Sequence, residues 1–490
     1  MADAATEMRS SGRPEDEMLG LWANIAYGLQ HVLTMYGGIV AVPLIVGQAA
    51  GLSTADIGLL ITASLFAGGM ATLLQTIGLP FFGCKLPLVQ GVSFAGVATM
   101  IAISGNGGIQ AVLGAVIAAS LIGLLITPIF SRVTRYFPPL VTGIVITTIG
   151  LTLMPVAAMW AMGGNSKAPN FGSTSNVMLA GVTLAIVLLL SKLGNAAISR
   201  LSILLALVIG TLIAYAAGMT DFSQVPNGPM FALPQVFHFG WPTFQLAAIL
   251  SMFIVIIVTL VETSADILAV GEIVETKVDS RRLGDGLRAD MISSVLAPVF
   301  GSFTQSAFAQ NVGLVAITGI KSRFVVATGG LFLIALGLLP VMGRVIAAVP
   351  SPVLGGAGIV LFGTVAASGI RTLSKVDYAD NMNLIIVATS IGFGMIPIAA
   401  PKFYDQFPAW VETIFHSGIS SSALMAILLN LLFNHVRTGN SEGQSVFAAA
   451  AERTIRYQDI SNLEDGDFFL NGKLYNSKGE EVPMVMPAHH

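Results

Sequence analysis

The amino-acid sequence predicts an all-α polytopic membrane protein, and three observations support this fold class. Only 10% of its 490 residues are charged, whereas a soluble protein of this length would carry about 25%. Hydrophobic residues make up 54% of the chain, and the mean hydropathy is +0.81. Long apolar segments recur along almost the whole sequence. We therefore expect a bundle of membrane-spanning helices.

The apolar segments predict fourteen spans, because a helix needs about 20 mostly apolar residues to cross roughly 30 Å of hydrocarbon. They lie near 23–46, 53–79, 86–103, 108–130, 139–160, 177–191, 201–217, 244–270, 284–300, 304–319, 324–346, 350–370, 378–399 and 417–434. The third and the tenth of these segments are interrupted by glycine, proline or polar residues.

Basic residues between the spans predict the orientation. With the N-terminus in the cytoplasm, all of them except Lys167, Arg344 and Lys402 fall in cytoplasmic loops. An excess of Lys and Arg in the cytoplasmic loops is typical of multi-pass proteins. We expect a protein of the inner (plasma) membrane with both termini, including residues 1–22, in the cytoplasm.

Fourteen spans divide into two repeats of seven, 23–217 and 244–434. Because seven is odd, the repeats would insert with opposite orientations. Inverted-repeat transporters are built this way, with a site near the midplane between broken helices. The interrupted third and tenth spans occupy equivalent places and carry Phe94 and Phe308, whose rings usually pack but could here stack on a flat ligand.

Residues 437–490 differ from the rest of the chain, since they have mixed charges and no span. Asn471 and Gly472 lie between two short apolar and aromatic runs, a pattern typical of a type I′ β-hairpin. We expect a small, partly ordered cytoplasmic appendage.

Three carboxylates lie within apolar spans, namely Glu262, Asp266 and Asp290. An acid at membrane depth is costly and usually functional. Glu262 and Asp266 are four residues apart and project from one face of the eighth span. Two acids that close resist simultaneous ionisation, so one could carry a proton. Asp290 follows Arg288 closely, and a structural role is equally compatible with its position.

Adjacent polar residues occur in the first span, Gln30 and His31, and in the tenth, Gln310 and Asn311. An unpaired polar group in the membrane interior costs several kcal/mol, so these side chains need partners or a ligand. We expect Gln30 and His31 to support a polar network rather than to contact a ligand.

Other chemistry is not indicated by the sequence. It contains no nucleophile–base signature, phosphate-binding loop or metal-ligand cluster, and Cys84 is its only cysteine. We therefore expect no enzymatic activity, cofactor, metal ion or nucleic-acid partner. Because no Walker motif is present, an ion gradient would have to drive uphill transport.

Five ordered motifs resemble those of the nucleobase-ascorbate transporter family. They are Gln30-His31, Ser93-Phe94-Ala95, the acidic motif 262–266, the ninth-span stretch 286–290, and 308–319 with Gln310-Asn311-x-Gly313 and Thr318-Gly319. The resemblance runs from about residue 20 to 435 and leaves out the tail.

The resemblance implies a fold of two inverted seven-span repeats. Spans 1–4 and 8–11 would form a core domain, and spans 5–7 and 12–14 a gate domain. The third and tenth spans would each begin with a short strand. Members are dimeric proton or sodium symporters, with protons used by the bacterial ones, and their core is thought to move against the gate as an elevator.

The resemblance also implies roles for individual residues. Substrate contacts are expected from Glu262, Gln310, Phe94, Phe308 and Ala309. Proton coupling is expected from Asp266, Asp290 and Glu262. A supporting polar network is expected from Gln30, His31, Asn311 and Thr318.

Gln310 indicates the substrate class. By resemblance, uracil-type members have Glu at this position and ascorbate-type members have Pro, whereas Gln is similar to the bacterial purine branch. A carboxamide offers a donor and an acceptor, which match the C=O and N–H of an oxopurine edge. Thr318-Gly319 resembles xanthine carriers, while 310–315 and 361–363 also resemble urate carriers, so xanthine and uric acid both stay open.

We therefore expect a proton-coupled symporter of xanthine or uric acid. The alternatives are a uracil or broader nucleobase symporter, and a channel or anion exchanger of the related seven-plus-seven fold. The acid pair Glu262 and Asp266 argues against a site built for an anion.

Overall fold

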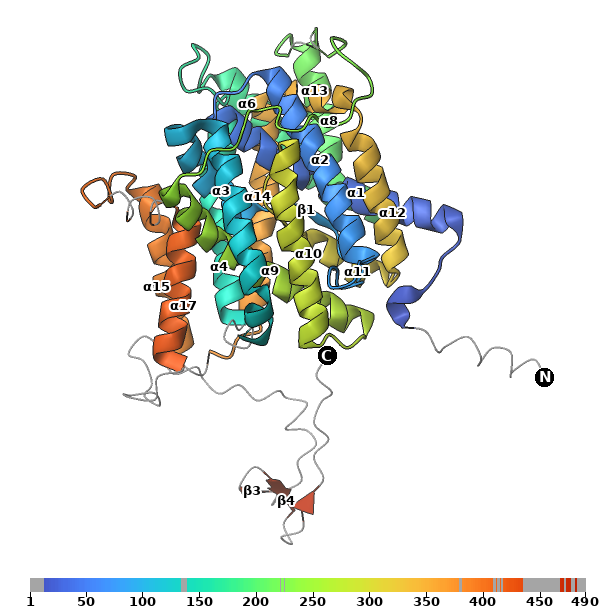
Figure 1. Cartoon of the computed structure of the whole chain (residues 1–490), viewed down its shortest axis with the longest axis vertical. Helices are drawn as coiled ribbons and strands as arrows, with labels where there is room; N and C mark the ends of the chain where they lie inside the picture. Colours follow the sequence, from blue (N-terminus) through green and yellow to red (C-terminus); the bar gives the residue numbers. More distant parts are fainter. Residues whose placement is uncertain are drawn as a thin grey trace, which may run out of the picture. The chain divides into compact units, whose positions relative to one another are not determined.

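The structure is a computed structural model that describes residues 13–133, 139–220, 222–223, 225–378, 381–408, 411, 415, 417–434, 468–470, 473–476 and 481–482. The chain divides into two units, Met1–Ser441 and Glu442–His490. The first unit is a bundle of helices with one short two-stranded sheet (Figure 1).

Every predicted apolar segment coincides with at least one helix. The first half contains α1 (Leu21–Ala49), α2 (Thr54–Thr76), α3 (Val97–Val133), α4 (Pro139–Thr152), α5 (Met154–Ala161), α6 (Thr174–Leu193), α7 (Ala196–Arg200) and α8 (Ser202–Ala216). The second half contains α9 (Leu246–Val274), α10 (Ser280–Leu296), α11 (Ala309–Thr318), α12 (Arg323–Gly337), α13 (Pro340–Ala347), α14 (Ser351–Leu373), α15 (Asn381–Ala399) and α17 (Gly418–Asn434).

The helices differ in their ability to cross a membrane. Among the described residues, eight helices are long and apolar enough, or nine if the bent pair α12 and α13 forms one span. Helices α8, α11 and α17 are apolar but shorter. Helix α3 contains the end of the third predicted span and all of the fourth, and Gly108, with φ 68°, breaks it between them. The count of fourteen spans stays a prediction.

The interrupted third and tenth segments contain the two strands of the sheet, β1 (Gln90–Val92) and β2 (Gln305–Ala307). The strands are antiparallel, with Gly91 opposite Ser306. Backbone groups at membrane depth must be paired within the protein, and the sheet pairs them here. Gly91 is required because a Cβ there would lie 2.6 Å from the Phe308 ring. The predicted short strands are confirmed.

Two groups of helices pack mainly within themselves. In the first group, α12 packs on α1 and α2, and α3 packs on α9 and α10. In the second group, α14 packs on α4, α5 and α6, and α17 packs on α4 and α15. These helices are among those that the family resemblance assigns to the core and the gate. Whether they move as domains stays a prediction.

The second unit contains β3 (Phe468–Leu470), β4 (Lys473–Tyr475) and β5 (Glu481–Val482). Strands β3 and β4 are antiparallel, with Leu470 opposite Lys473, as the predicted hairpin requires. The predicted turn residues, 471 and 472, lie outside the described residues.

Candidate functional site

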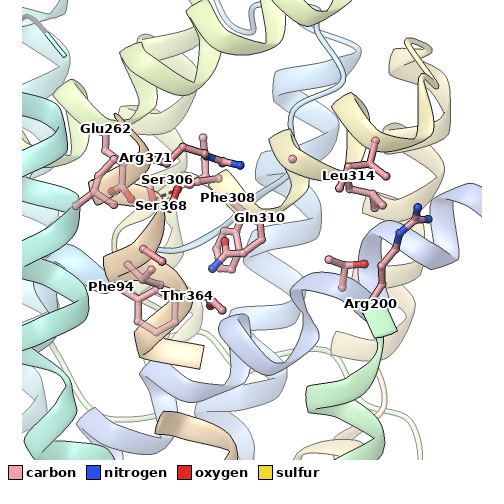
Figure 2. A pocket seen from close by; sticks show the side chains of 18 of the residues that line it. Phe94, Arg200, Glu262, Ser306, Phe308, Gln310, Leu314, Thr364, Ser368 and Arg371 are labelled. Carbon is pink, nitrogen blue, oxygen red and sulfur yellow. Dashed lines mark hydrogen bonds between the residues drawn. The ribbon is translucent and has the colours of Figure 1, made fainter. Parts of the chain in front are cut away.

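A cavity of about 440 Å³ lies where the start of α11 meets α9 and α14 (Figure 2). Its volume falls within the range of about 300–1,000 Å³ that is usual for small-molecule sites. The five predicted substrate contacts all line it, namely Phe94, Glu262, Phe308, Ala309 and Gln310. They come from segments far apart in the sequence, so the fold itself assembles the site.

The two-stranded sheet positions three of these residues. Phe308 donates its backbone N–H to Val89 O at 3.1 Å, directly after β2 ends. Helix α11 then begins at Ala309, so Ala309 and Gln310 occupy its first turn. The first turn of a helix leaves backbone N–H groups without intrahelical acceptors. The cavity is therefore bordered by hydrogen-bond donors and by the positive end of a helix dipole.

Aromatic rings form one wall of the cavity. The Phe94 and Phe308 rings have centroids 6.4 Å apart and an interplanar angle of 49°. Phe94 also packs edge-on against Phe362, with centroids 6.0 Å apart. Both Phe94 and Phe308 are buried. Such a wall suits a planar heterocycle, which can pack against an aromatic face or edge.

Glu262 and Asp266 lie on one face of α9 but line different cavities. Glu262 lines the first cavity, and its Oε2 is buried without a hydrogen-bond partner among the described residues. Asp266 lines a second cavity of about 490 Å³, and its buried Oδ2 likewise has no partner among these residues. Buried polar atoms in proteins are nearly always paired, so two such carboxylates mark positions for a ligand or a proton.

The two cavities share part of their walls. The common lining residues are Ile146, Ala309, Gly313, Ser368 and Arg371. The second cavity is also lined by Glu272 and Lys375, near the ends of α9 and α14. The cavity lined by Glu262 and the cavity lined by Asp266 therefore adjoin at these residues.

Asp290 lines neither cavity and belongs to a hydrogen-bond network with Thr263 and Gln75. It accepts a bond from Thr263 Oγ1 at 2.5 Å and one from Gln75 Nε2 at 3.0 Å. The opposite end of the Gln75 amide accepts the backbone N–H of Cys84 at 2.9 Å. These hydrogen bonds connect α2, α9 and α10 next to Glu262, which lines the first cavity.

The expected polar network is assembled only in part. Asn311 Nδ2 lies 3.1 Å from His31 Nδ1 and donates to His31 O at 3.0 Å, which links α11 to α1. The backbone carbonyl of Gln30 accepts the hydroxyl of Thr34 at 2.8 Å within α1, and this bond does not involve His31 or Asn311. The Thr318 hydroxyl donates to Leu314 O within its own helix. The structure thus joins His31 to Asn311 and places Thr318 apart from this pair.

Several lining residues were not predicted from the sequence. They are the polar residues Thr34, Arg200, Ser306, Thr364, Ser368 and Arg371. In Figure 2, Glu262, Ser306, Ser368 and Arg371 gather on one side of the cavity, and Arg200 lies with Leu314 on the other. Helical spacing could have indicated part of this set, because Thr364, Ser368 and Arg371 recur on one face of α14.

Comparison with known families gives one extensive match. The model described as "Permease family" (Xan_ur_permease) matches residues 23–403. This range includes every residue that was predicted for the site.

Several curated proteins are similar over most of their length. The chain is 41% identical over 434 residues to the uric acid transporter UacT of Escherichia coli (strain K12), covering 87% of this chain and 90% of the relative. It is 40% identical over 415 residues to the xanthine permease of Bacillus subtilis (strain 168), covering 85% and 94%. It is 33% identical over 421 residues to the xanthine permease XanP of Escherichia coli (strain K12), covering 82% and 90%.

Solved structures with little sequence identity share the fold. The transmembrane domain of the cyanobacterial bicarbonate transporter BicA has a TM-score of 0.55 at 15% identity, covering 85% of this chain and 99% of that one. SLC26A9 has a TM-score of 0.57 at 12% identity, covering 84% and 66%. These likenesses concern the fold alone, and they confirm the predicted fold class of a polytopic helical transporter, while the number of spans stays a prediction.

Proposed function

The chain belongs to the nucleobase-ascorbate transporter family of permeases, and we propose that it imports a purine nucleobase by proton-coupled symport. Uric acid and xanthine are the proposed substrates. Proteins named for both are similar to this chain at 40–41% identity.

The observation that carries the proposal is the unpaired oxygen of Glu262 in the same cavity as the Gln310 amide. Gln310 offers an N–H donor and a C=O acceptor to one edge of an oxopurine. Glu262 offers an acceptor to a ring N–H elsewhere on the base. The rings of Phe94 and Phe308 supply the apolar wall. These features together match a flat heterocycle with several donors and acceptors.

The proposed coupling uses the acids near the site. Glu262 and Asp266 each have one buried oxygen without a protein partner among the described residues, so either can take up a proton without breaking a bond at that atom. Asp290 would contribute through its bond to Thr263, which neighbours Glu262. A proton bound with the substrate would offset the cost of moving a negative charge through the membrane.

The proposed transport movement is a displacement of the core helices against the gate helices. The cavity supports this, because Glu262 comes from α9 of the first packing group, which the segments with Phe94 and Gln310 contact. Thr364, Ser368 and Arg371 come from α14 of the second group. We further propose a homodimer in the inner membrane with cytoplasmic termini, as the family resemblance and the distribution of basic residues indicate.

One observation favours a second function, anion exchange. Arg200 and Arg371 line the cavity, and the bicarbonate transporter BicA shares the fold. A small inorganic anion would, however, leave the aromatic wall and the Gln310 amide without a role. Purine transport accounts for more of the lining.

The test is uptake into proteoliposomes that contain the purified protein. Radiolabelled uric acid, xanthine, hypoxanthine, uracil and bicarbonate would be compared, each with and without an imposed pH gradient. We expect uptake of uric acid or xanthine that the inward proton gradient increases. Uptake of bicarbonate alone would refute purine transport, and equal uptake of uracil would replace it with a broader nucleobase function.

A further inference from the structure

A third cavity, of about 530 Å³, lies away from the transport site, where the loop after α2 meets the start of α10. It has no lining residue in common with the two cavities described above. Five of its lining side chains are basic and two are acidic, which gives a formal charge of +3. The basic residues are Arg13, Lys85, Lys277, Arg281 and Arg282, and the acidic ones are Asp279 and Asp285.

Arg282, one of the five basic residues, stabilises the wall of this basic cavity through its hydrogen bonds and an ion pair. Arg282 Nη2 forms an ion pair with Glu15 Oε1 at 2.6 Å, and Glu15 is only 1% exposed. The same guanidinium donates to Cys84 O at 2.6 Å and to Lys85 O at 2.9 Å. Arg282 therefore fixes the loop after α2 against α10.

Neither acid neutralises the other cations. Asp285 forms an ion pair with Arg288, and Asp279 caps α10 by accepting the backbone N–H of Arg282 at 2.8 Å. Among the described residues, no carboxylate lies within 4.0 Å of the charged groups of Arg13, Lys85, Lys277 or Arg281. The cavity is therefore rimmed by four cations that are not in ion pairs within this part of the chain.

The loop beside these cations presents apolar side chains outward. Phe82 and Leu79 exchange backbone hydrogen bonds of 3.0 and 2.8 Å in a tight turn. Phe81 at the tip has φ 70°, which is uncommon for a bulky residue and needs support from its surroundings. Leu79 is 62% exposed and Phe81 63%. Since the loop directly follows a predicted span, we expect these side chains to lie where headgroups meet acyl chains.

We propose that the basic cavity binds the phosphate headgroup of an anionic phospholipid, with Leu79 and Phe81 packed on its acyl chains. Basic pockets beside membrane helices are suited to such headgroups, because each nearby Lys or Arg attracts the anion. A free phosphate would satisfy the cations but would leave the adjacent apolar pair in water. The site lies beside Glu15 of the N-terminal segment, and with the predicted orientation it takes a lipid of the cytoplasmic leaflet.

A bound headgroup would connect the two repeats of the chain. Lys85 follows the second predicted span, whereas Lys277 and Arg281 lie between the eighth and ninth. A phosphate held between them would act beside the Glu15–Arg282 ion pair, which already joins the N-terminal segment to α10. The bound lipid is expected to raise the thermal stability of the protein.

The test compares lipid binding to wild type and to a triple variant, Lys85→Gln, Lys277→Gln and Arg281→Gln. Delipidated protein would be titrated with phosphatidylglycerol or phosphatidylcholine. Native mass spectrometry would count the bound lipid molecules, and a separate thermal unfolding experiment would record the unfolding temperature at each lipid concentration. Loss of three charges should weaken phosphatidylglycerol binding on the order of 100-fold. A matched triple variant, Lys167→Gln, Lys192→Gln and Lys402→Gln, keeps the cavity and should bind like wild type.

Three results would overturn the proposal. The first is equal binding of phosphatidylglycerol by the wild type and the cavity variant. The second is stabilisation by inorganic phosphate or glycerol 3-phosphate as large as that by the lipid, which would indicate a site for a free anion. The third is equal binding of phosphatidylcholine, which carries no net charge. If the triple variant does not fold, the three single variants replace it, and an absence of loss in all of them refutes the site.

Discussion

Thr263 donates its hydroxyl to Asp290 across 2.5 Å, and the same oxygen accepts the backbone N–H of Ala307 at 3.3 Å. Thr263 directly follows Glu262 in α9, and Ala307 directly precedes Phe308. One hydroxyl therefore connects the buried acid of α10 with both the carboxylate and the aromatic wall of the proposed purine site.

The first prediction concerns this hydroxyl. Thr263→Val keeps the shape of the side chain but leaves Asp290 Oδ2 and Ala307 N without this partner. We expect it to lower the free energy of unfolding by about 1–3 kcal/mol, the cost of a buried polar group left unsatisfied. Thermal unfolding of purified protein measures the effect, with Thr263→Ser as the control that keeps the hydroxyl. Equal stability of the Val and Ser variants would show that the bond is not needed.

The second prediction concerns Glu262. Glu262→Gln keeps the size of the side chain but removes the negative charge and the ability to take up a proton. We expect purine uptake to be abolished while the protein still reaches the membrane. Glu272→Gln, on the same helix but lining only the second cavity, is the matched control and should retain uptake. Wild-type uptake by Glu262→Gln at normal expression would remove this residue from the site.

The third prediction concerns the driving ion. If a proton enters with each purine, lowering the external pH steepens the inward proton gradient, so uptake should rise. A protonophore should abolish accumulation above the external concentration. The measurement is radiolabelled uptake at several external pH values in sodium-free and sodium-containing buffers. A requirement for sodium, with no response to the protonophore, would assign the coupling to sodium instead.

The fourth prediction concerns Arg371, which lines both cavities. Uric acid is largely a monoanion at neutral pH, whereas hypoxanthine is neutral. If the Arg371 guanidinium donates to the bound urate, Arg371→Gln removes a charge-assisted hydrogen bond worth about 1.5–3 kcal/mol. Urate binding should then weaken roughly tenfold or more.

Competition binding with both purines checks this prediction, and Arg371→Lys, which keeps the charge, should lie between wild type and Arg371→Gln. An equal loss for urate and hypoxanthine would mean that Arg371 shapes the cavity rather than attracting an anion.

The sequence predicted the parts of the site that depend on local pattern. The breaks near Phe94 and Phe308 indicated interrupted spans at equivalent places, as is typical of inverted repeats, and the family resemblance implied a short strand in each. The structure pairs these strands and brings the rings within 6.4 Å of each other. Membrane depth likewise singled out Glu262, which lines the cavity.

Features set by tertiary packing were not predictable in this way. Helical spacing placed Glu262 and Asp266 on one face, but the neighbours of α9 direct them to different cavities. Arg371 was assigned to a loop, whereas α14 continues to Leu373 and carries it along the cavity. Thr318 has a partner within its own helix, which no motif reveals.

The last prediction concerns Gln310, whose amide lines the cavity beside Phe308. Gln310→Glu keeps the shape and one acceptor but replaces the N–H donor with an oxygen. A purine carbonyl that accepted this N–H would then lose a buried hydrogen bond, which costs roughly 1–3 kcal/mol or about tenfold in affinity. A protonated Glu could pair with other edges, so the range of ligands should broaden towards uracil.

Calorimetric or competition binding of uric acid, xanthine and uracil to both proteins measures affinity and selectivity together. Gln310→Asn, which keeps the carboxamide but shortens it, controls for simple loss of fit. If Gln310→Glu binds the purines with unchanged affinity and selectivity, Gln310 does not read the base, and the choice of purine over uracil would have to come from other residues of the cavity.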